Sequence, residues 1–414
     1  MILSANCAVQ GKKILKMLKT MHAFPVTSRI DWVGALDPDM RVFDVIMHTE
    51  HGSSYNSYLV KGEKTCLIDG VKKAFFDEWK ARIEDAGCQL QQIDYIVLNH
   101  TEPDHAGSIA QLLEQAPQIK VLCSRSASNL IKEIVNHPVD IQVVGEGDSF
   151  DLGGLTLEFI GAPFLHWPDT IFTYVPEEKV MFTCDAFGFH HCAPGVYDDT
   201  LDTNALIDSQ KYYFDVIMGP FKEHVLKACD KLDQYAIDVI APSHGPVLRT
   251  HPKEAVERYR TWAAGPQVEN KALVTYVSCY GYTRMLAEAA ADELKKQGVE
   301  TELLDITSLP MAQVADKFMH AKAVIVGSPT INRDALPPVW QLLTSLDAIN
   351  TRGKIAAVVG SFGWSGEGVK FATARLEQLN CKVMGSLACK LQPTEADLEK
   401  ARALAQEVAQ AMQA

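Results

Sequence analysis

Several features that would place the chain in a common protein class are missing. No two of its ten cysteines are spaced C-x-x-C, which argues against an iron–sulfur or rubredoxin-type site and against a disulfide framework. The sequence has no run of eighteen apolar residues, so we expect no membrane span. The formal net charge of −13 provides no basic excess for phosphate contacts, which disfavours nucleic acid as a partner.

The composition that is present fits a globular protein in aqueous surroundings. Apolar residues make up 47% of the chain and charged residues 22%. A length of 414 residues is too great for one compact core, so we expect two domains. The segment Met1–Thr20 carries Lys12, Lys13, Lys16 and Lys19 and lacks the apolar stretch of a secretory signal. We therefore expect a cytoplasmic protein.

The first part of the chain mixes short strands with alternating strands and helices. Lys61–Lys64 is predicted to be a hairpin turn, and Ala74–Ala86 has the apolar spacing of a helix. This mixture predicts two sheets flanked by helices. The expected strands are Val42–His48, Ser57–Val60, Thr65–Ile68, Tyr95–Leu98, Val121–Cys123, Leu155–Ile160, Ile171–Val175 and Val180–Thr183, and another helix begins at about Ala106.

Near Ala263-Ala264-Gly265-Pro266 the pattern changes to a strict alternation of strands and helices. This alternation predicts a doubly wound, five-stranded parallel sheet. We therefore predict one domain at residues 1–265 and a second at 266–414. The expected strands of the second domain are Ala272–Val277, Glu302–Asp305, Ala323–Gly327, Ile355–Gly360 and one around Lys382–Leu387.

Four side chains of metal-ligand type stand within six residues, directly after the strand that ends at Leu98. The hexapeptide is His100-Thr101-Glu102-Pro103-Asp104-His105, and its proline marks it as a loop. A short rigid loop can aim several side chains at one point, and the spacing H-x-[DE]-x-[DE]-H rarely arises by chance. The motif therefore predicts a metal site.

Three further candidate ligands occur where other predicted strands pass into loops. They are His166, Asp185 and His244. A single histidine or aspartate in such a place is more often structural. Together with the hexapeptide, the three residues indicate a larger ligand set.

The order H-x-E-x-D-H, His, Asp, His resembles the metallo-β-lactamase fold in its flavodiiron protein branch, the type A flavoproteins. Hydrolases of that fold usually have H-x-H-x-D-H, and here Glu102 replaces the middle histidine. Neutral imidazole favours zinc, whereas an added hard carboxylate suits iron and stabilises its higher oxidation state. The substitution therefore favours a pair of iron ions.

The resemblance also assigns a role to each candidate ligand. It implies that His100, Glu102 and His166 bind one iron, that Asp104, His105 and His244 bind the other, and that Asp185 bridges them. In some members of the family, the histidine at the position of His105 is not a steady ligand. We expect His190 and His191 to lie at the surface or behind the ligands, and Tyr197 to lie near the substrate pocket.

The second domain has a candidate flavin site at three strand ends. The first is Ser278-Cys279-Tyr280-Gly281-Tyr282-Thr283, with a helix from about Arg284, and its S-x-x-G-x-T spacing resembles the flavodoxin phosphate loop. A dinucleotide is disfavoured because G-x-G-x-x-G is absent after the first strand, so FMN is the expected cofactor. The other two segments are Ser328-Pro329-Thr330-Ile331-Asn332 and Ser361-Phe362-Gly363-Trp364-Ser365-Gly366, in which Trp364 is placed to stack on the flavin ring.

The resemblance covers almost the whole chain and implies a fold and an activity. The fold is α/β, with an N-terminal metallo-β-lactamase-like αββα sandwich and a C-terminal flavodoxin-like sheet. The activity is the reduction of dioxygen to water, of nitric oxide to nitrous oxide, or of both, with electrons that FMN delivers to a di-iron centre. Reduced FMN and a diferrous pair hold two electrons each, which suffices for the four-electron and the two-electron reaction.

The resemblance also implies partners. The electron donor is expected to be rubredoxin or a separate reductase. Since no rubredoxin-like segment follows Ala414, the chain is expected to be of the minimal two-domain class. The family forms head-to-tail homodimers or dimers of dimers, in which the FMN of one subunit lies beside the iron pair of the other.

Two other functions stay open from the residues alone. The first is a zinc hydrolase of the metallo-β-lactamase fold that carries a flavodoxin module, with an activated water as its nucleophile. Glu102 argues against it. The second is an electron-transfer or redox-sensing flavoprotein with a structural metal site. Reoxidation of reduced FMN by either gas would separate the enzyme from the carrier.

Overall fold

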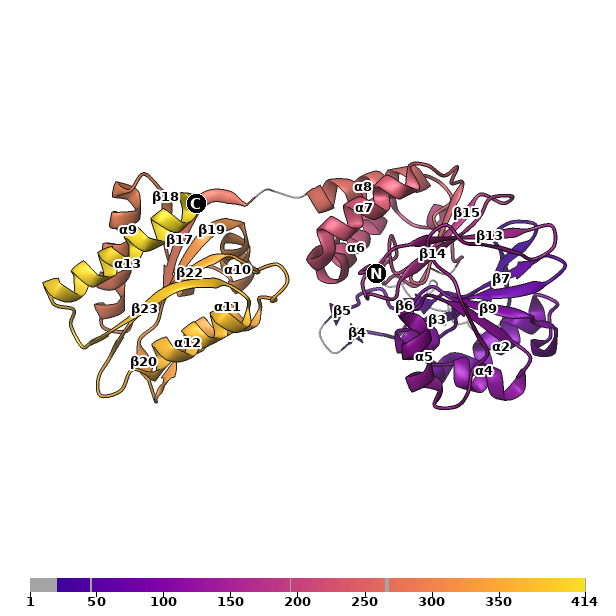
Figure 1. Cartoon of the computed structure of the whole chain (residues 1–414), viewed down its shortest axis with the longest axis horizontal. Coiled ribbons are helices and arrows are strands. Elements are labelled where there is room, and N and C mark those ends of the chain that lie inside the picture. Colours follow the sequence, from indigo (N-terminus) through magenta and orange to yellow (C-terminus); the bar gives the residue numbers. More distant parts are fainter. Residues whose placement is uncertain (1–20, 45–46, 194, 265–267, 414) are drawn as a thin grey trace, which may run out of the picture. The chain divides into compact units, whose positions relative to one another are not determined.

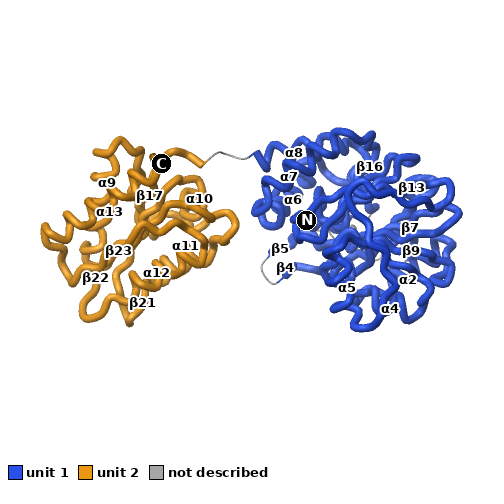
Figure 2. The backbone as a smooth tube through the Cα atoms, viewed as in Figure 1, with its two compact units in different colours: residues 1–264 blue, residues 265–414 orange. Residues whose placement is uncertain are grey.

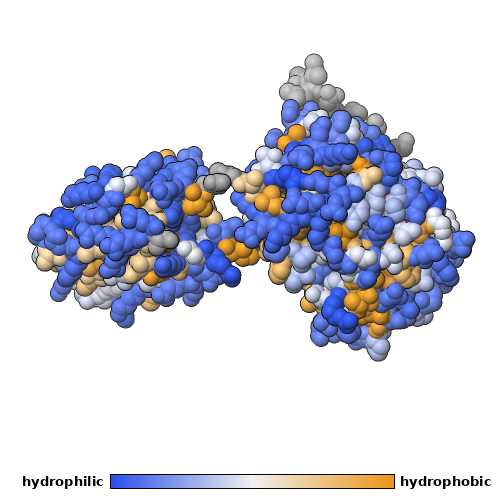
Figure 3. All heavy atoms as spheres, turned by 45° about the horizontal axis from the view of Figure 1, so that its top comes forward, coloured by the Kyte–Doolittle hydropathy of each residue, from blue (hydrophilic) through white to orange (hydrophobic). Residues whose placement is uncertain are grey.

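The computed structural model describes residues 21–44, 47–193, 195–264 and 268–413 (Figure 1). The chain forms two compact units, residues 1–264 and 265–414 (Figure 2). The predicted domain boundary between 265 and 266 and the Met1–Thr20 segment lie outside the described residues. Among the described helices, none combines the length and the apolar character that a membrane span requires. Polar side chains cover most of the visible face of each unit (Figure 3).

The first unit contains two large β-sheets. One sheet consists of β1 (Phe24–Pro25), β2 (Ile30–Trp32), β7 (Tyr58–Lys61), β8 (Thr65–Ile68), β9 (Tyr95–Leu98), β10 (Lys120–Cys123) and β11 (Ile141–Val143), in that order. The other consists of β12 (Ser149–Asp151), β13 (Thr156–Gly161), β14 (Ile171–Val175), β15 (Val180–Cys184) and β16 (Val239–Pro242). Two small sheets pair β3 (Ala35–Asp37) with β6 (Ser53–Tyr55) and β4 (Val42–Phe43) with β5 (Met47–His48).

Helices cover the outer face of each large sheet (Figure 1). The seven-stranded sheet packs against α2 (Phe76–Asp85), α4 (Ile109–Gln115) and α5 (Ala127–Val135), and the five-stranded sheet packs against α6 (Thr203–Tyr213), α7 (Lys222–Leu232) and α8 (Pro252–Ala264). The remaining elements are α3 (Pro103–Ala106), the 3-10 helices η1 (Lys73–Phe75), η2 (Leu90–Gln92), η3 (Asp198–Thr200) and η5 (Gly219–Phe221), and the π-helix η4 (Phe214–Met218).

Alternating side chains of each strand serve two different cores. In β8, Cys66 and Ile68 face the five-stranded sheet, whereas Leu67 between them packs with the helices. The core between the sheets is completed from the other side by Phe159, Phe182 and their neighbours. A third core lies between the five-stranded sheet and its own helices, and the three cores together confirm the predicted αββα sandwich.

Most predicted strands of the first unit are present, and two local predictions are wrong. Val42–His48 is not one strand, because the chain turns at Asp44, whose φ of +46° separates β4 from β5. The hexapeptide is not entirely a loop, since Pro103 begins the one-turn helix α3. Proline fits this first helical position because its missing N–H would have no helical partner there.

The second unit is a five-stranded sheet in which every neighbouring pair is parallel. It consists of β18 (Glu300–Asp305), β17 (Glu269–Tyr276), β19 (Ala321–Gly327), β22 (Ile355–Phe362) and β23 (Lys382–Lys390), in that order. With the strands numbered along the chain, this is the 2-1-3-4-5 order of flavodoxin-like sheets. A small hairpin joins β20 (Thr330–Ile331) and β21 (Asp334–Ala335).

Helices lie on both faces of this sheet (Figure 1). Leu273 and Leu304 face one helical layer, and the alternate residues Ala272 and Val274 face the other. The doubly wound prediction is therefore confirmed. The first layer contains α10 (Met311–His320), α11 (Pro337–Thr344) and α12 (Glu367–Gln378), the second contains α9 (Tyr282–Lys296) and α13 (Glu395–Gln413), and the 3-10 helix η6 (Ile306–Ser308) follows β18.

Candidate metal and flavin sites

The fold brings all seven candidate ligands of the first unit to one edge of the sandwich. The hexapeptide follows β9 of the seven-stranded sheet. His166 lies between β13 and β14, and because these two strands are antiparallel, their connection lies at the same edge as the carboxyl ends of β15 and β16. Asp185 and His244 follow those ends. Both sheets therefore contribute ligands, and the backbone joins them here, where the Ile171 amide donates to the Asn99 carbonyl at 2.9 Å.

One group of ligand atoms surrounds Oε2 of Glu102. This oxygen lies 2.9 Å from Nε2 of His166 and 3.3 Å from Nε2 of His100. The two histidine nitrogens lie 3.5 and 3.6 Å from Oδ2 of Asp185. Two ligand atoms that share one ion at about 2.1 Å lie roughly 3.0 to 3.5 Å apart. These four side chains therefore have the spacing of a metal site.

A second group surrounds Asp104. Its Oδ2 lies 3.0 Å from Nε2 of His244, and its Oδ1 lies 3.3 Å from Nε2 of His105. The same two nitrogens lie 3.4 and 3.1 Å from Oδ1 of Asp185. Asp185 therefore presents one oxygen to each group, which is the geometry that a carboxylate bridging two ions requires.

Buried polar atoms without partners support metal binding at this place. Both carboxylate oxygens of Asp104 and Oδ2 of Asp185 are buried and make no hydrogen bond to any residue that the structure describes. Leaving a carboxylate in this state is unfavourable unless a cation neutralises it. The candidate ligands provide three carboxylates and four imidazoles. This mixed set suits two divalent iron ions, whereas a set of nitrogen ligands alone would favour zinc.

Side chains behind the ligands fix two of the histidine rings. Nδ1 of His100 lies 3.1 Å from Oδ1 of Asp169, and the Asp169 side chain is fully buried. The other oxygen of Asp169, Oδ2, accepts hydrogen bonds from the amide and the hydroxyl of Thr101. Nδ1 of His244 donates to the carbonyl of Ser54 at 2.7 Å. Both contacts leave Nε2 free to bind a metal. Sequence reasoning missed Asp169, although it stands only three residues after His166.

The charges of the metal-free site are strongly coupled. Burial opposes protonation of His100, but hydrogen bonds to Asp169 and Glu102 raise its pKa to about 9. Burial also opposes the charged form of Asp104, but His105 and His244 lower its pKa below the ordinary value. Protonated histidines and ionised carboxylates therefore stabilise one another in the absence of metal. A bound cation would take the place of those protons.

Two further histidines lie close to the ligands. His190 and His191 are each only 8% exposed, so a surface position is wrong for both. The ring of His190 packs against that of His244 with centroids 4.9 Å apart. His191 stacks on His51 at 4.5 Å, and its Nδ1 lies 3.2 Å from the Ser209 hydroxyl. Of the two, His190 is the one that contacts a candidate ligand.

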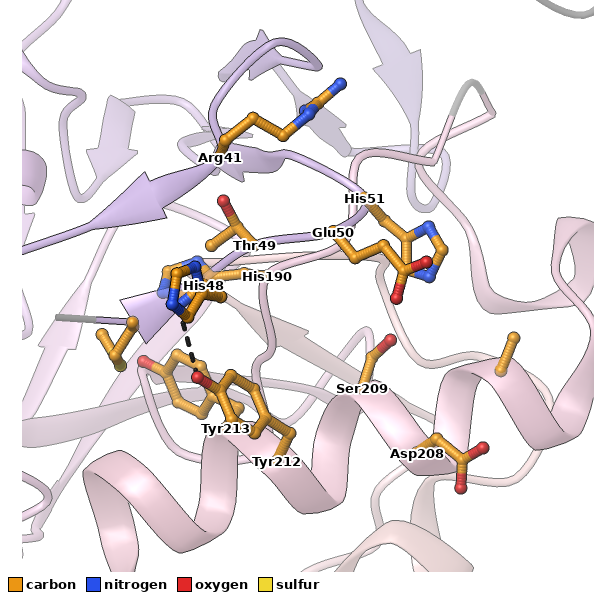
Figure 4. A pocket seen from close by; sticks show the side chains of 12 residues that line it. Arg41, His48, Thr49, Glu50, His51, His190, Asp208, Ser209, Tyr212 and Tyr213 are labelled. Atoms are coloured by element: carbon orange, nitrogen blue, oxygen red, sulfur yellow. Dashed lines mark hydrogen bonds between the residues drawn. The ribbon is translucent and has the colours of Figure 1, made fainter. Parts of the chain in front are cut away.

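A cavity of about 680 Å³ lies beside this metal site (Figure 4). His190 and Tyr213 line the cavity, and the rings of both also contact His244. Tyr197 does not line it. Its hydroxyl donates to the Pro25 carbonyl at 2.6 Å, and its ring lies under the guanidinium of Arg249. The expectation that Tyr197 lies near the substrate pocket is therefore not supported.

The three predicted flavin segments lie at the carboxyl edge of the parallel sheet. They follow β17, β19 and β22, which are neighbours in the sheet. The hydroxyls of Thr283 and Ser361 are 2.9 Å apart and join the first segment to the third. The Ser328 amide donates to the Val359 carbonyl at 3.0 Å, which places the second segment beside β22. The segments thus form one continuous site.

The local structure of these segments fits a flavin phosphate and ring. Gly281 precedes α9 with a φ of +84° and has no side chain to cap this helix, and the Ser278 hydroxyl accepts from the Arg284 amide at 3.4 Å. Amides and hydroxyls at a helix N-terminus are suited to bind a phosphate. A β-carbon added at Gly281 or Gly363 would meet no atom within 4 Å, so the backbone is open to a ligand there. Tyr280 and Trp364 are 85% and 81% exposed. Aromatic side chains this exposed are typical of a ligand-binding edge.

Known proteins are similar to this chain over almost its whole length. Two family models match it, ODP family beta lactamase over residues 54–245 and flavodoxin over residues 274–404. The flavo-diiron protein FprA2 of Clostridium acetobutylicum is 42% identical over 390 residues, which cover 92% of this chain and 97% of that protein. A nitric oxide reductase of Moorella thermoacetica is 36% identical over 390 residues, covering 93% of this chain and 97% of its own.

Among solved structures, the rubredoxin oxygen:oxidoreductase of the anaerobe Desulfovibrio gigas has a TM-score of 0.69 and 30% identity to this chain. The match covers 95% of this chain and 99% of that one. Both domains are therefore shared, and in the same order. With 42% identity to a named member over almost its whole length, the chain belongs to the flavodiiron protein family.

Proposed function

We propose that the chain is a di-iron flavoenzyme that reduces dioxygen to water, nitric oxide to nitrous oxide, or both, with electrons delivered through FMN. The observation that carries the proposal is the position of Asp185, whose two oxygens face two separate groups of ligand atoms. A site with two ions can offer a diatomic molecule two adjacent electron sources. The relatives named nitric oxide reductase and rubredoxin oxygen:oxidoreductase support both substrates.

In the proposed site, His100, Glu102 and His166 hold one iron, Asp104, His105 and His244 hold the other, and Asp185 bridges them. The irons would act as Lewis acids and reductants, and FMN would return electrons to them. Asp169 keeps the ring of His100 oriented, and the Ser54 carbonyl does the same for His244. His190 and Tyr213 line the cavity, and their rings also pack against that of His244.

The FMN is proposed to lie across the three segments of the second unit. The N-terminus of α9 would hold its phosphate, and Ser278, Thr283 and Ser361 would supply hydroxyls. Trp364 would cover one face of the flavin ring. Residues of all three segments remain proposed contacts, among them Pro329, Asn332, Phe362 and Gly366.

We also propose a head-to-tail homodimer, or a dimer of such dimers, in the cytoplasm. The proposal follows from the resemblance, in which the FMN of one subunit serves the iron pair of its partner. Rubredoxin or a separate reductase would supply the electrons, and the relative named rubredoxin oxygen:oxidoreductase supports the former. Analytical sedimentation of the active enzyme tests this arrangement. We expect a dimer or a tetramer, and a strictly monomeric active enzyme would contradict the proposal.

The central test combines metal analysis with anaerobic kinetics. The purified chain should contain two irons and one FMN, and stopped-flow mixing of the reduced protein with each gas should reoxidise the flavin. Zinc with ester or thioester hydrolysis and no flavin reoxidation would instead identify a hydrolase. Flavin that neither gas reoxidises would identify an electron carrier. Steady-state rates with each gas would then measure substrate preference.

A further inference from the structure

One buried ring nitrogen beside the metal site belongs to no proposed ligand. Nε2 of His190 has no hydrogen-bond partner among the described residues, and its residue is more than nine-tenths buried. The other unpartnered buried atoms of this site among the described residues are carboxylate oxygens of Asp104 and Asp185, for which bound iron supplies a reason, and Nδ1 of His105, whose Nε2 faces the candidate metal position. Because His190 is not a proposed iron ligand, its unpartnered Nε2 requires a different explanation.

The ring of His190 is held in one place from three sides. Phe43 covers it at a centroid distance of 4.4 Å, and Tyr213 meets it edge-on at 5.0 Å. His244, a proposed ligand of the second iron, packs against it at 4.9 Å. The segment that carries His190 also carries Asp185, the proposed bridge, five residues earlier in the sequence. The ring is thus fixed relative to the second iron position.

Ser53 determines which nitrogen of the ring can donate. Its hydroxyl lies 2.8 Å from Nδ1 of His190 and 3.3 Å from the carbonyl of Ser54. The hydroxyl has one proton to donate, and the shorter contact, to Nδ1 of His190, forms the stronger hydrogen bond. With Nδ1 accepting from Ser53, the proton of the imidazole resides on Nε2. The unpartnered atom is therefore an N–H donor.

We propose that His190 is a substrate-positioning residue, which donates a hydrogen bond from Nε2 to the oxygen atom of a diatomic gas held at the Asp104, His105 and His244 side of the site. The proposal rests on the function proposed above. The oxygen end of nitric oxide or dioxygen gains negative charge as it accepts electrons, and an N–H donor stabilises that charge. The packing of Phe43, Tyr213 and His244 around the ring already restricts its rotamer, so little side-chain freedom is lost when it donates.

The test uses the N–O stretching frequency of nitric oxide bound to the reduced, iron-loaded protein. A hydrogen bond to the nitrosyl oxygen lowers this frequency, so H190F should give a higher frequency than the unchanged protein. H190F should also bind nitric oxide about tenfold more weakly, the effect of losing one such bond. In H190Q the side-chain amide can take the place of Nε2–H, so its frequency should return toward that of the unchanged protein.

His191 provides the matched control. It is as buried as His190 but contacts His51 and Ser209 rather than a ligand, so H191Q should leave the frequency and the affinity unchanged. Iron content is measured for every variant, and H190Q keeps the test open if H190F does not fold. Equal frequencies in H190F, H190Q and the unchanged protein at full iron content would overturn the role of His190 alone. An unchanged protein that holds iron but binds neither gas would overturn this role and the proposed function together.

Discussion

Oδ1 of Asp169 lies 3.1 Å from Nδ1 of His100, although the two residues are sixty-nine positions apart in the sequence. Asp169 is fully buried and makes two further hydrogen bonds, both to Thr101. It therefore fixes the tautomer of His100 and the direction of its Nε2. Carboxylates in this position also increase the basicity of the ligand.

Replacing Asp169 should weaken iron binding without removing a ligand. We expect D169A to lower the affinity for iron about 10-fold to 100-fold, because His100 loses its orientation. Competition with a chelator measures the change. D238A, which removes an exposed aspartate of the same unit, is the control. Equal iron retention in D169A and D238A would contradict the role of Asp169.

Removing the proposed bridge should have a larger effect than removing a ligand of one ion. D185A takes an oxygen from both groups of ligand atoms, so we expect loss of both irons. E102A takes an oxygen from one group, so we expect the iron at Asp104, His105 and His244 to persist. The number of irons per chain, measured by mass spectrometry of digested protein, distinguishes the loss of both irons from the loss of one. Equal losses in the two variants would exclude separate roles.

Glu102 should control which metal the site prefers. E102H creates the H-x-H-x-D-H pattern of zinc hydrolases, and neutral imidazole favours zinc over iron. We expect the ratio of bound zinc to bound iron to rise at least about tenfold when both are offered under anaerobic conditions. E102Q is the control, because it removes the charge without adding an imidazole. An unchanged ratio of zinc to iron in E102H would show that Glu102 does not determine which metal the site binds.

The iron-free chain should lose stability as the pH rises. The pKa of His100 is raised from 6.5 to about 9 in the folded chain, so folded His100 holds its proton after the unfolded chain has lost it. The resulting stabilisation is complete below about pH 6.5 and disappears as the pH approaches about 9, a change of up to roughly 3 kcal/mol. Urea unfolding of iron-free protein across this interval measures it. In H100Q this decline should be smaller.

Iron affinity should change in the opposite direction over the same interval. Iron has to displace the proton of His100, so binding should strengthen as the pH rises toward about 9. The release of protons during iron binding near neutral pH, followed with an indicator dye, gives a second measure. Affinity that is independent of pH would contradict the raised pKa of His100.

Flavin binding should depend on the contact between two of the three segments. The hydroxyls of Thr283 and Ser361 are buried and 2.9 Å apart, so T283V breaks the link without a large change in volume. We expect FMN affinity to fall about 5-fold to 10-fold, the effect of one hydrogen bond. Quenching of flavin fluorescence measures this. T344V, at an exposed threonine of α11, should bind FMN normally.

Much of the fold was predictable because hydrophobic patterns are local. The strands at Thr65–Ile68, Tyr95–Leu98 and Ile171–Val175 have the predicted bounds, since each is a short apolar run with a turn or loop beside it. Val42–His48 has an equally apolar pattern but turns at Asp44. Aspartate adopts a positive φ more often than most residues, so Asp44 was the one local sign of this turn, although its conformation is set by the folded loop.

The candidate ligand set was visible in the sequence because its members are concentrated at strand ends, and six residues contain four of them. The environment of these residues was not visible. Asp169 reaches His100 only when the two sheets pack together, and His190 reaches His244 only because β16 lies beside β15. Tyr197 shows the opposite case, in which proximity to Asp185 in the sequence did not place it at the cavity.

The ligands come from both layers of the sandwich, with the hexapeptide on one sheet and His166, Asp185 and His244 on the other. A growing chain on the ribosome therefore cannot assemble the complete iron site until β16 and His244 have been synthesised and the second sheet has docked on the first. Metal insertion becomes a late step of maturation, after nearly the whole first unit has emerged. Ions bound there would link the two layers and add to the free energy of unfolding of the first unit, so chains made when iron is scarce would unfold and be degraded more readily.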